Sequence, residues 1–189
     1  VVAYRDEGNS NKGTAIVGTI SNGSITYGSE VIFESGEIGV SSSSTVNVVY
    51  DVANAKFVIF YTESTNSQYP TAIVGTVSGT SISFGGRTQI SSKRPADLSA
   101  VYDSNADKTV VAFRDDADTK DGFAVVCTVS GTSISAGSAT NFTSANTLYI
   151  AIAFDSTANK VVISFNVSNI TSKAIVGTVS NTSISFGTA

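Results

Sequence analysis

Short apolar segments separated by polar turns run through the whole chain. Ser81 to Phe84 alternates strictly between serine and an apolar residue, which is typical of a half-exposed strand. Ile150 to Phe154 is continuously apolar, as expected for a strand covered on both faces. No segment shows an amphipathic period of 3.6 residues. The pattern therefore predicts an all-β chain.

One phrase, clearest between Thr71 and Gly85, occurs four times. Its copies begin at alanines that lie 57, 52 and 50 residues apart, namely Ala15, Ala72, Ala124 and Ala174. A period of this size indicates one supersecondary unit that is stacked several times.

Each complete repeat is predicted to contain four short antiparallel strands. An aspartate, Asp51, Asp103 or Asp155, ends the first strand, and its carboxylate is expected to accept backbone hydrogen bonds in the following turn. The third and fourth strands are predicted to form a hairpin with positive φ at its turn. The four hairpin turns are Asn22-Gly23, Gly79-Thr80, Gly131-Thr132 and Asn181-Thr182. The longest connection between repeats runs from Glu34 to Thr45.

Four such units predict a four-bladed β-propeller of four-stranded antiparallel blades, forming one domain over residues 1–189. The blades are expected at about 1–33, 45–90, 98–142 and 147–189. The alternative is an open stack of four-stranded sheets.

The first blade is expected to lack its inner strand. Val1 to Asp6 aligns with Val110 to Asp115, the second strand of the third repeat. We therefore expect the chain to be part of a longer protein. Because unpaired backbone groups at a buried edge are costly, we also expect the missing strand to come from the parent chain or from self-assembly with a second copy.

Charge and hydropathy argue against two classes of partner. The chain has 189 residues, 14% of them charged, and a net charge of −4 without a Lys/Arg cluster. Nucleic-acid binding requires neutralisation of phosphates, so no nucleic-acid partner is predicted. No run of 18 apolar residues is present, so no membrane span is predicted either.

The residues for common catalytic chemistry are missing. The chain has no histidine and a single cysteine, Cys127, which rules out Ser-His and Cys-His nucleophiles and histidine zinc sites. The innermost strand positions Asn47, Ser99 and Ala151 provide no carboxylate pair for glycoside hydrolysis. We predict no enzyme activity and no cofactor. Cys127 stands where the other repeats have glycine, and we interpret it as a buried strand residue.

Two acidic stretches resemble calcium ligands, which are oxygen atoms. The first contains Asp115, Asp116, Asp118 and Asp121, but it occurs in one repeat and Lys120 interrupts it. The second, Asp103-x-Asn105-x-Asp107, occupies a turn that has no such pattern in the other repeats. We interpret the first as a solvated loop and the second as a turn, and we predict no metal site.

The ends of the second strands are the candidate binding positions. An aromatic residue followed by Arg-Asp or a related pair suits sugar or carboxylate recognition, because arginine presents a planar fork of donors. The alternative is a set of ordinary solvated ion pairs. The candidate ligand-binding residues are Tyr4, Arg5, Asp6, Tyr61, Glu63, Phe113, Arg114 and Asp115.

The phrases Lys-Val-Val-x-Ala-Tyr-Arg-Asp and Ala-Ile-Val-Gly-Thr-Val-Ser-Gly-Thr-Ser-Ile-Ser-Phe-Gly resemble repeat proteins predicted from marine phage and metagenomic sequences, some of them tail-fibre or virion-surface components. The resemblance covers all four repeats and carries no catalytic residue. It implies an extracellular or virion-surface location and a non-catalytic binding module. The chain is more distantly similar to propeller lectins, which implies a glycan ligand, although the unequal loops after the second strands depart from one site per blade. The alternatives are a purely structural assembly module and a glycoside hydrolase-like propeller.

Overall fold

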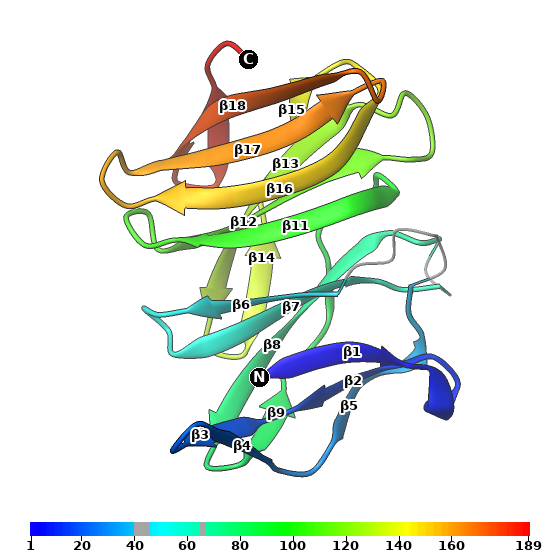
Figure 1. Cartoon of the computed structure of the whole chain (residues 1–189), viewed down its shortest axis with the longest axis vertical. Coiled ribbons are helices and arrows are strands. Elements are labelled where there is room, and N and C mark those ends of the chain that lie inside the picture. Colours follow the sequence, from blue (N-terminus) through cyan, green and yellow to red (C-terminus); the bar gives the residue numbers. More distant parts are fainter. Residues whose placement is uncertain (40–45, 65–66) are drawn as a thin grey trace.

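The computed structural model describes residues 1–39, 46–64 and 67–189, and these residues form an all-β structure (Figure 1). Apart from a short 3-10 turn at Glu7–Asn9, the described residues contain no helix. The predicted connection from Glu34 to Thr45 is described only as far as residue 39, and its remainder lies outside the described ranges.

Four sheets follow one another in chain order, and we number them accordingly. Sheet 1 contains β1 (Val2–Asp6), β2 (Lys12–Ile16) and β5 (Val31–Glu37), and a separate hairpin of β3 (Gly18–Ser21) and β4 (Ser24–Tyr27) extends from it. Sheet 2 contains β6 (Asn47–Asp51), β7 (Lys56–Thr62), β8 (Pro70–Ser78), β9 (Ser81–Phe84) and β10 (Thr88–Gln89). Sheet 3 contains β11 (Pro95–Asp103), β12 (Lys108–Asp115), β13 (Gly122–Ser130), β14 (Ser133–Ala136) and β15 (Thr140–Thr143). Sheet 4 contains β16 (Thr147–Asp155), β17 (Lys160–Val167), β18 (Thr171–Ser180) and β19 (Ser183–Phe186).

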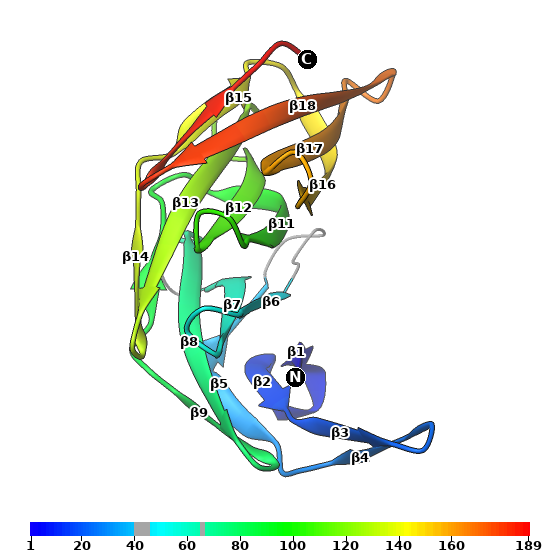
Figure 2. The ribbon, with the colours of Figure 1, turned by 90° about the vertical axis from the view of Figure 1, so that its left-hand side faces the viewer.

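The sheets form a curved row along the long axis of the molecule. Figure 2 shows β1, β6, β11 and β16 along its concave side and β9 and β14 along its convex side. The N-terminus lies in sheet 1 and the C-terminus in sheet 4, at opposite ends of the row (Figure 2). The described residues therefore form an open arrangement, and a closed four-bladed ring is not observed.

The local turn chemistry agrees with the sequence pattern. Backbone N–H groups of Asn54, Asn105 and Thr157 donate to the Oδ1 atoms of Asp51, Asp103 and Asp155 at 3.0, 2.9 and 2.8 Å. At the hairpin turns φ is positive, between 49° and 76°, at Asn22, Gly23, Gly79, Gly131 and Asn181. The prediction of these turns is confirmed, and Asp103 is a turn residue as expected.

In the second and third repeats the third strand pairs not only with the second and fourth strands but also with a short strand of the following connection, which the sequence did not predict. In sheet 2, β8 pairs through Thr71 and Ala72 with β10, and through Gly75 to Ser78 with β9. Strand β13 likewise pairs with both β14 and β15. Because the third strand has nine residues and the fourth only four, the connection that follows takes up the remaining backbone groups. In sheet 1, β5 lies in the connection that follows the first repeat phrase, and it pairs with β2 in the same way.

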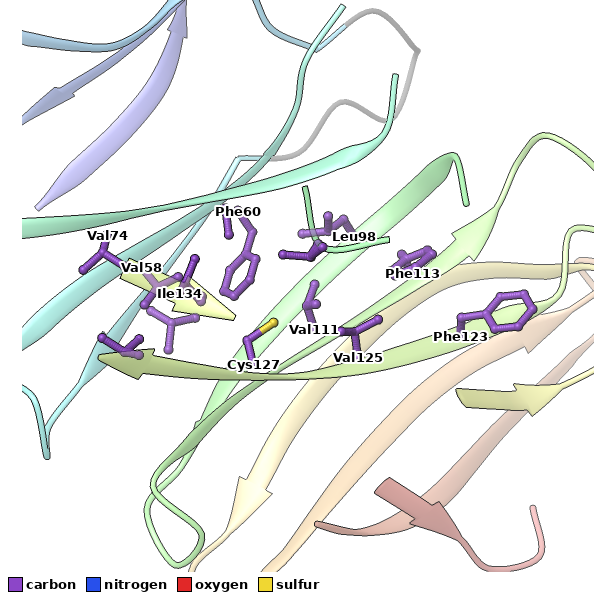
Figure 3. Close-up of a cluster of buried hydrophobic side chains, with 14 residues drawn as sticks. Val58, Phe60, Val74, Leu98, Val111, Phe113, Phe123, Val125, Cys127 and Ile134 are labelled. Carbon is purple, nitrogen blue, oxygen red and sulfur yellow. The ribbon is translucent and has the colours of Figure 1, made fainter. Parts of the chain in front are cut away.

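Three apolar clusters hold the row together, each shared by two consecutive sheets. Figure 3 shows the middle cluster, in which Phe60 and Val74 of sheet 2 face Val111, Val125 and Ile134 of sheet 3. A sheet that is apolar on both faces is covered only by its neighbours, so burial between sheets is the main source of stability.

Glycines at the end of the fourth strand allow neighbouring sheets to approach closely. A Cβ atom at Gly28, Gly85 or Gly137 would lie 2.0, 1.9 and 1.9 Å from a backbone carbonyl oxygen in the hairpin turn of the next sheet. The three carbonyls belong to Thr80, Thr132 and Thr182. The glycine that closes the repeat phrase is therefore required for packing between sheets.

Cys127 is fully buried in the middle cluster (Figure 3), as predicted. Burial raises the pKa of its thiol to about 12, and the thiolate is the reactive form. We expect no reaction of the native chain with a thiol-specific disulfide reagent at pH 8. One equivalent should react after unfolding in guanidinium chloride, which serves as the control. A rapid native-state reaction would contradict the burial of Cys127.

Candidate functional site

The second strands of all four repeats end on the same side of the molecule, where β1, β7, β12 and β17 point to the right in Figure 1. The candidate residues therefore lie along one edge of the row. They fall into three separate groups, one at each of the first three strand ends.

The group at the end of β1 forms surface ion pairs. The guanidinium of Arg5 lies 3.2 Å from Glu7 and 3.4 Å from Glu37. The Tyr4 hydroxyl donates to Glu30, and this hydrogen bond is the main reason why the pKa of Tyr4 rises to about 12. Asp6, the third candidate here, is half-buried. The contacts of Arg5 and Tyr4 are partly exposed, so each contributes little to stability.

The group at the end of β12 is largely used in internal contacts. Arg114 pairs with Asp116 at 2.8 Å and with Asp97 at 3.7 Å. Lys93 lies 3.1 Å from the buried Asp115. The Phe113 ring is fully buried, so it leaves no face on which a sugar could stack.

At the end of β7, the candidates Tyr61 and Glu63 lie beside Glu34 and Arg87, which come from the connections between repeats. We call these four residues the Arg87 cluster. Nη1 of Arg87 donates to Glu34 Oε2 at 2.7 Å and to Glu63 Oε1 at 2.9 Å. The buried Tyr61 hydroxyl donates to Glu34 Oε2 at 3.0 Å. The two glutamate side chains are only 3% and 7% exposed, whereas the Arg87 side chain is 52% exposed. One half-exposed cation thus serves two buried carboxylates.

The charge state of the Arg87 cluster follows from these contacts. Burial by itself raises the pKa of Glu34, but hydrogen bonds from the Gly36 N–H, Arg87 and Tyr61 outweigh it and hold the pKa below its ordinary value. Burial, followed by the charge of Glu34, raises the pKa of Tyr61. Glu34 is therefore ionised and Tyr61 neutral at pH 7.

A hollow of about 310 Å³ lies beside the cluster between sheets 1 and 2. Its lining residues are Ile32, Phe33, Glu34, Ser35, Ile73, Gly85 and Arg87. Since only Nη1 of Arg87 is engaged, its other N–H groups meet no acceptor among the described residues. The hollow thus brings the exposed side chain of Ile32 close to the half-exposed guanidinium of Arg87.

Glu34 and Arg87 were not predicted, because connections between repeats carry no periodic pattern. Glu30 and Ala139 occupy the repeat positions that correspond to Arg87. One feature of the sequence could have indicated a distant cation. Glu63 follows Thr62, whereas the equivalent Asp6 and Asp115 each follow an arginine. A buried carboxylate without an adjacent cation needs one from elsewhere in the chain.

The acidic stretch after β12 does not converge on one point. Asp115 pairs with Lys93, Asp116 with Arg114, and Asp121 accepts a hydrogen bond from Asn141 at 3.3 Å. Within the described ranges, no group of three or more His, Cys, Asp or Glu residues could hold a metal ion. The same residues include no helix that is long and apolar enough to cross a membrane.

Comparison with known proteins yields no relative. No protein-family model matches the chain, and no curated protein or solved structure matches it significantly.

Proposed function

We propose that the chain is a non-catalytic binding module made of propeller-like blades, and that the hollow beside Arg87 binds a neutral glycan. The observation that carries this proposal is the half-exposed guanidinium of Arg87, oriented by two buried carboxylates at the wall of the hollow. A resemblance to virion-surface repeat proteins supports an extracellular or virion-surface location.

The charges of the Arg87 cluster favour a neutral, hydroxyl-rich ligand. Two buried carboxylates and one guanidinium leave a local excess of negative charge, and the chain itself has a net charge of −4. An anionic ligand would be repelled. The hydroxyls of a sugar accept hydrogen bonds from a guanidinium, and the C–H face of the same sugar can pack on an exposed apolar side chain such as Ile32.

Glycoside hydrolysis fits the cluster less well. A glycosidase needs one carboxylic acid with a raised pKa to protonate the leaving group. Interactions with Arg87, Gly36 and Tyr61 lower the pKa of Glu34 instead. Glu34 is therefore better suited to holding Arg87 than to transferring a proton.

A purely structural role is the second candidate. It is favoured by the ion pairs at the end of β12, where Arg114 and Asp115 are both engaged within the chain. On this view the Arg87 cluster would only join sheets 1 and 2.

A glycan array followed by calorimetric titration of the best neutral oligosaccharide tests the proposal. Arg87→Lys keeps the charge that the buried glutamates require but loses the planar fork of donors, so we expect affinity to fall at least about tenfold. Arg94→Lys is the matched control and should bind like the wild type, since within the described part of the chain the ion pair of Arg94 is the long one to Asp116, at 3.9 Å. Absence of binding to any neutral glycan, or unchanged affinity in Arg87→Lys, would contradict the proposal.

A further inference from the structure

The two ends of the row expose apolar side chains, and several of them stand at repeat positions that are buried between the internal sheets. We call the outer face of sheet 4 the tail face, and the outer face of sheet 1 with its β3–β4 hairpin the head face. Each internal interface consists of one face of each kind, because consecutive sheets pack tail to head.

The tail face is defined by Ala151, Ala153, Ala174 and Val176, all of which are exposed. Val176 is 47% exposed, whereas the corresponding Val74 and Val126 are buried in the clusters between sheets 2 and 3 and between sheets 3 and 4. Ala174 corresponds in the same way to the buried Ala72 and Ala124. The tail face of sheet 4 thus repeats a surface that, in sheets 2 and 3, is covered by the next sheet.

The head face is defined by Val2, Ile20, Ile25 and Tyr27, which are all exposed. Ile25 is 52% exposed, whereas the corresponding Ile82, Ile134 and Ile184 are buried. Val2 corresponds to Ile59, Val111 and Ile163, which are fully buried. Sheet 1 thus repeats the surface that each later sheet turns toward its predecessor.

The close backbone contact between sheets consists of a glycine in one sheet and a hairpin carbonyl in the next. At the two ends of the row, the described residues provide no partner for the corresponding glycine and the corresponding hairpin residue. Gly187 corresponds to Gly28, Gly85 and Gly137, but the nearest atom to a Cβ built there is Val176 O at 3.9 Å. Gly23 corresponds to the hairpin threonines whose carbonyls approach those glycines, and a Cβ built at Gly23 meets nothing within 4 Å. The Gly23 carbonyl of one molecule can occupy, over Gly187 of another, the place that Thr182 occupies over Gly137.

We propose that the head face of one copy of this chain docks on the tail face of a second copy, reproducing the interface that the chain already uses three times between its own sheets. The occupant is a second copy because these internal interfaces show that the two surfaces are complementary. The contact is heterologous, with different surfaces on the two partners, so it joins copies head to tail. None of the eight residues that define the faces is charged, so the docking should persist at high salt.

Single-face variants test this docking by light scattering coupled to size-exclusion chromatography, over a concentration series at 0.5 M salt. The wild type should show a mass above that of one chain that increases with concentration. Val176→Asp removes the tail face and Ile25→Asp the head face, so each variant alone should be monomeric. An equimolar mixture of the two should form two-chain particles and nothing larger, because one intact head and one intact tail remain. Val52→Asp, at an exposed position in the turn after β6, is the control and should associate like the wild type.

Three outcomes would overturn the proposal. They are a monomeric wild type at every concentration, an associating Val176→Asp variant, or a mixture of the two variants that stays monomeric. Far-UV circular dichroism and thermal unfolding of each variant establish that it is folded. If Ile25→Asp does not fold, Tyr27→Asp, at another exposed position of β4, replaces it as the head variant.

Discussion

Replacing Gly137 with alanine is expected to lower the free energy of unfolding by about 3 kcal/mol, a large effect for a single methyl group. The added Cβ would lie 1.9 Å from the backbone carbonyl oxygen of Thr182. Backbone atoms cannot rotate away as a side chain can, so sheets 3 and 4 would have to separate. The separation would loosen the cluster that includes Val126, Phe142 and Ile184.

The matched control for this prediction is Gly187→Ala. Gly187 occupies the same repeat position and its N–H donates to Val176 O at 3.0 Å, as that of Gly137 donates to Val126 O at 2.8 Å. Among the described residues, the nearest atom to a Cβ built at Gly187 is Val176 O, 3.9 Å away, and no neighbouring sheet approaches it as closely as sheet 4 approaches Gly137. At concentrations low enough for a monomer, its unfolding free energy should stay within about 0.5 kcal/mol of the wild type. Urea unfolding followed by circular dichroism measures both values, and equal values for the two variants would show that the sheets are not in close contact at Gly137.

Replacing Arg87 with methionine is expected to lower the free energy of unfolding by about 2–3 kcal/mol at pH 7. The substitution leaves Glu34 and Glu63 buried without their shared cation. Since Arg87 itself is 52% exposed, solvent screens part of the loss, and we place the effect below that of a fully buried ion pair.

The pH dependence separates this effect from a loss of packing. The pKa of Glu34 is lower in the folded protein than its ordinary value of 4.5. The contribution of this ionised group is therefore present above pH 4.5 and is lost as the pH falls through the folded pKa. Arg87→Met loses the hydrogen bond and the charge of Arg87, both of which lower the pKa of Glu34, so ionised Glu34 is less stabilised in the variant. The stability difference between the wild type and Arg87→Met should be largest at pH 7 and shrink toward pH 3.

Urea unfolding of both proteins at pH 7, 5 and 3 measures this difference. Arg94→Met is the matched control, because the Arg94–Asp116 pair is 3.9 Å long and partly exposed, and it should cost about 0–1 kcal/mol. A difference between wild type and Arg87→Met that does not change with pH would contradict the assigned ionisation of Glu34.

The sequence alone determined the strands of the repeat phrase and the turns between them, because both depend on local interactions, but it did not predict β5, β10 and β15 in the connections between repeats. Alternation of side chains with a period of two identifies a strand wherever it lies in the fold. The carboxylate of Asp103 reaches the N–H groups of Asn105 and Ala106 in its own turn, and Asn22-Gly23 adopts positive φ because of its residue types. The repeat also predicted that Cys127 is buried, since its equivalents lie within a strand.

Tertiary structure decided how the sheets sit together and which side chains meet. Glu34 and Arg87 are 53 residues apart, and only the stacking of sheet 1 on sheet 2 brings them into contact. Burial of the Tyr61 and Phe113 rings depends on the same stacking, because an apolar strand position indicates burial without naming the sheet that covers it. The repeat is compatible with a closed ring or an open row, since both use the same contact between neighbouring sheets. In the described residues, side chains such as Phe60, Val74 and Ile134 pack between neighbouring sheets, and the sheets follow one another in a curved, open row (Figure 2).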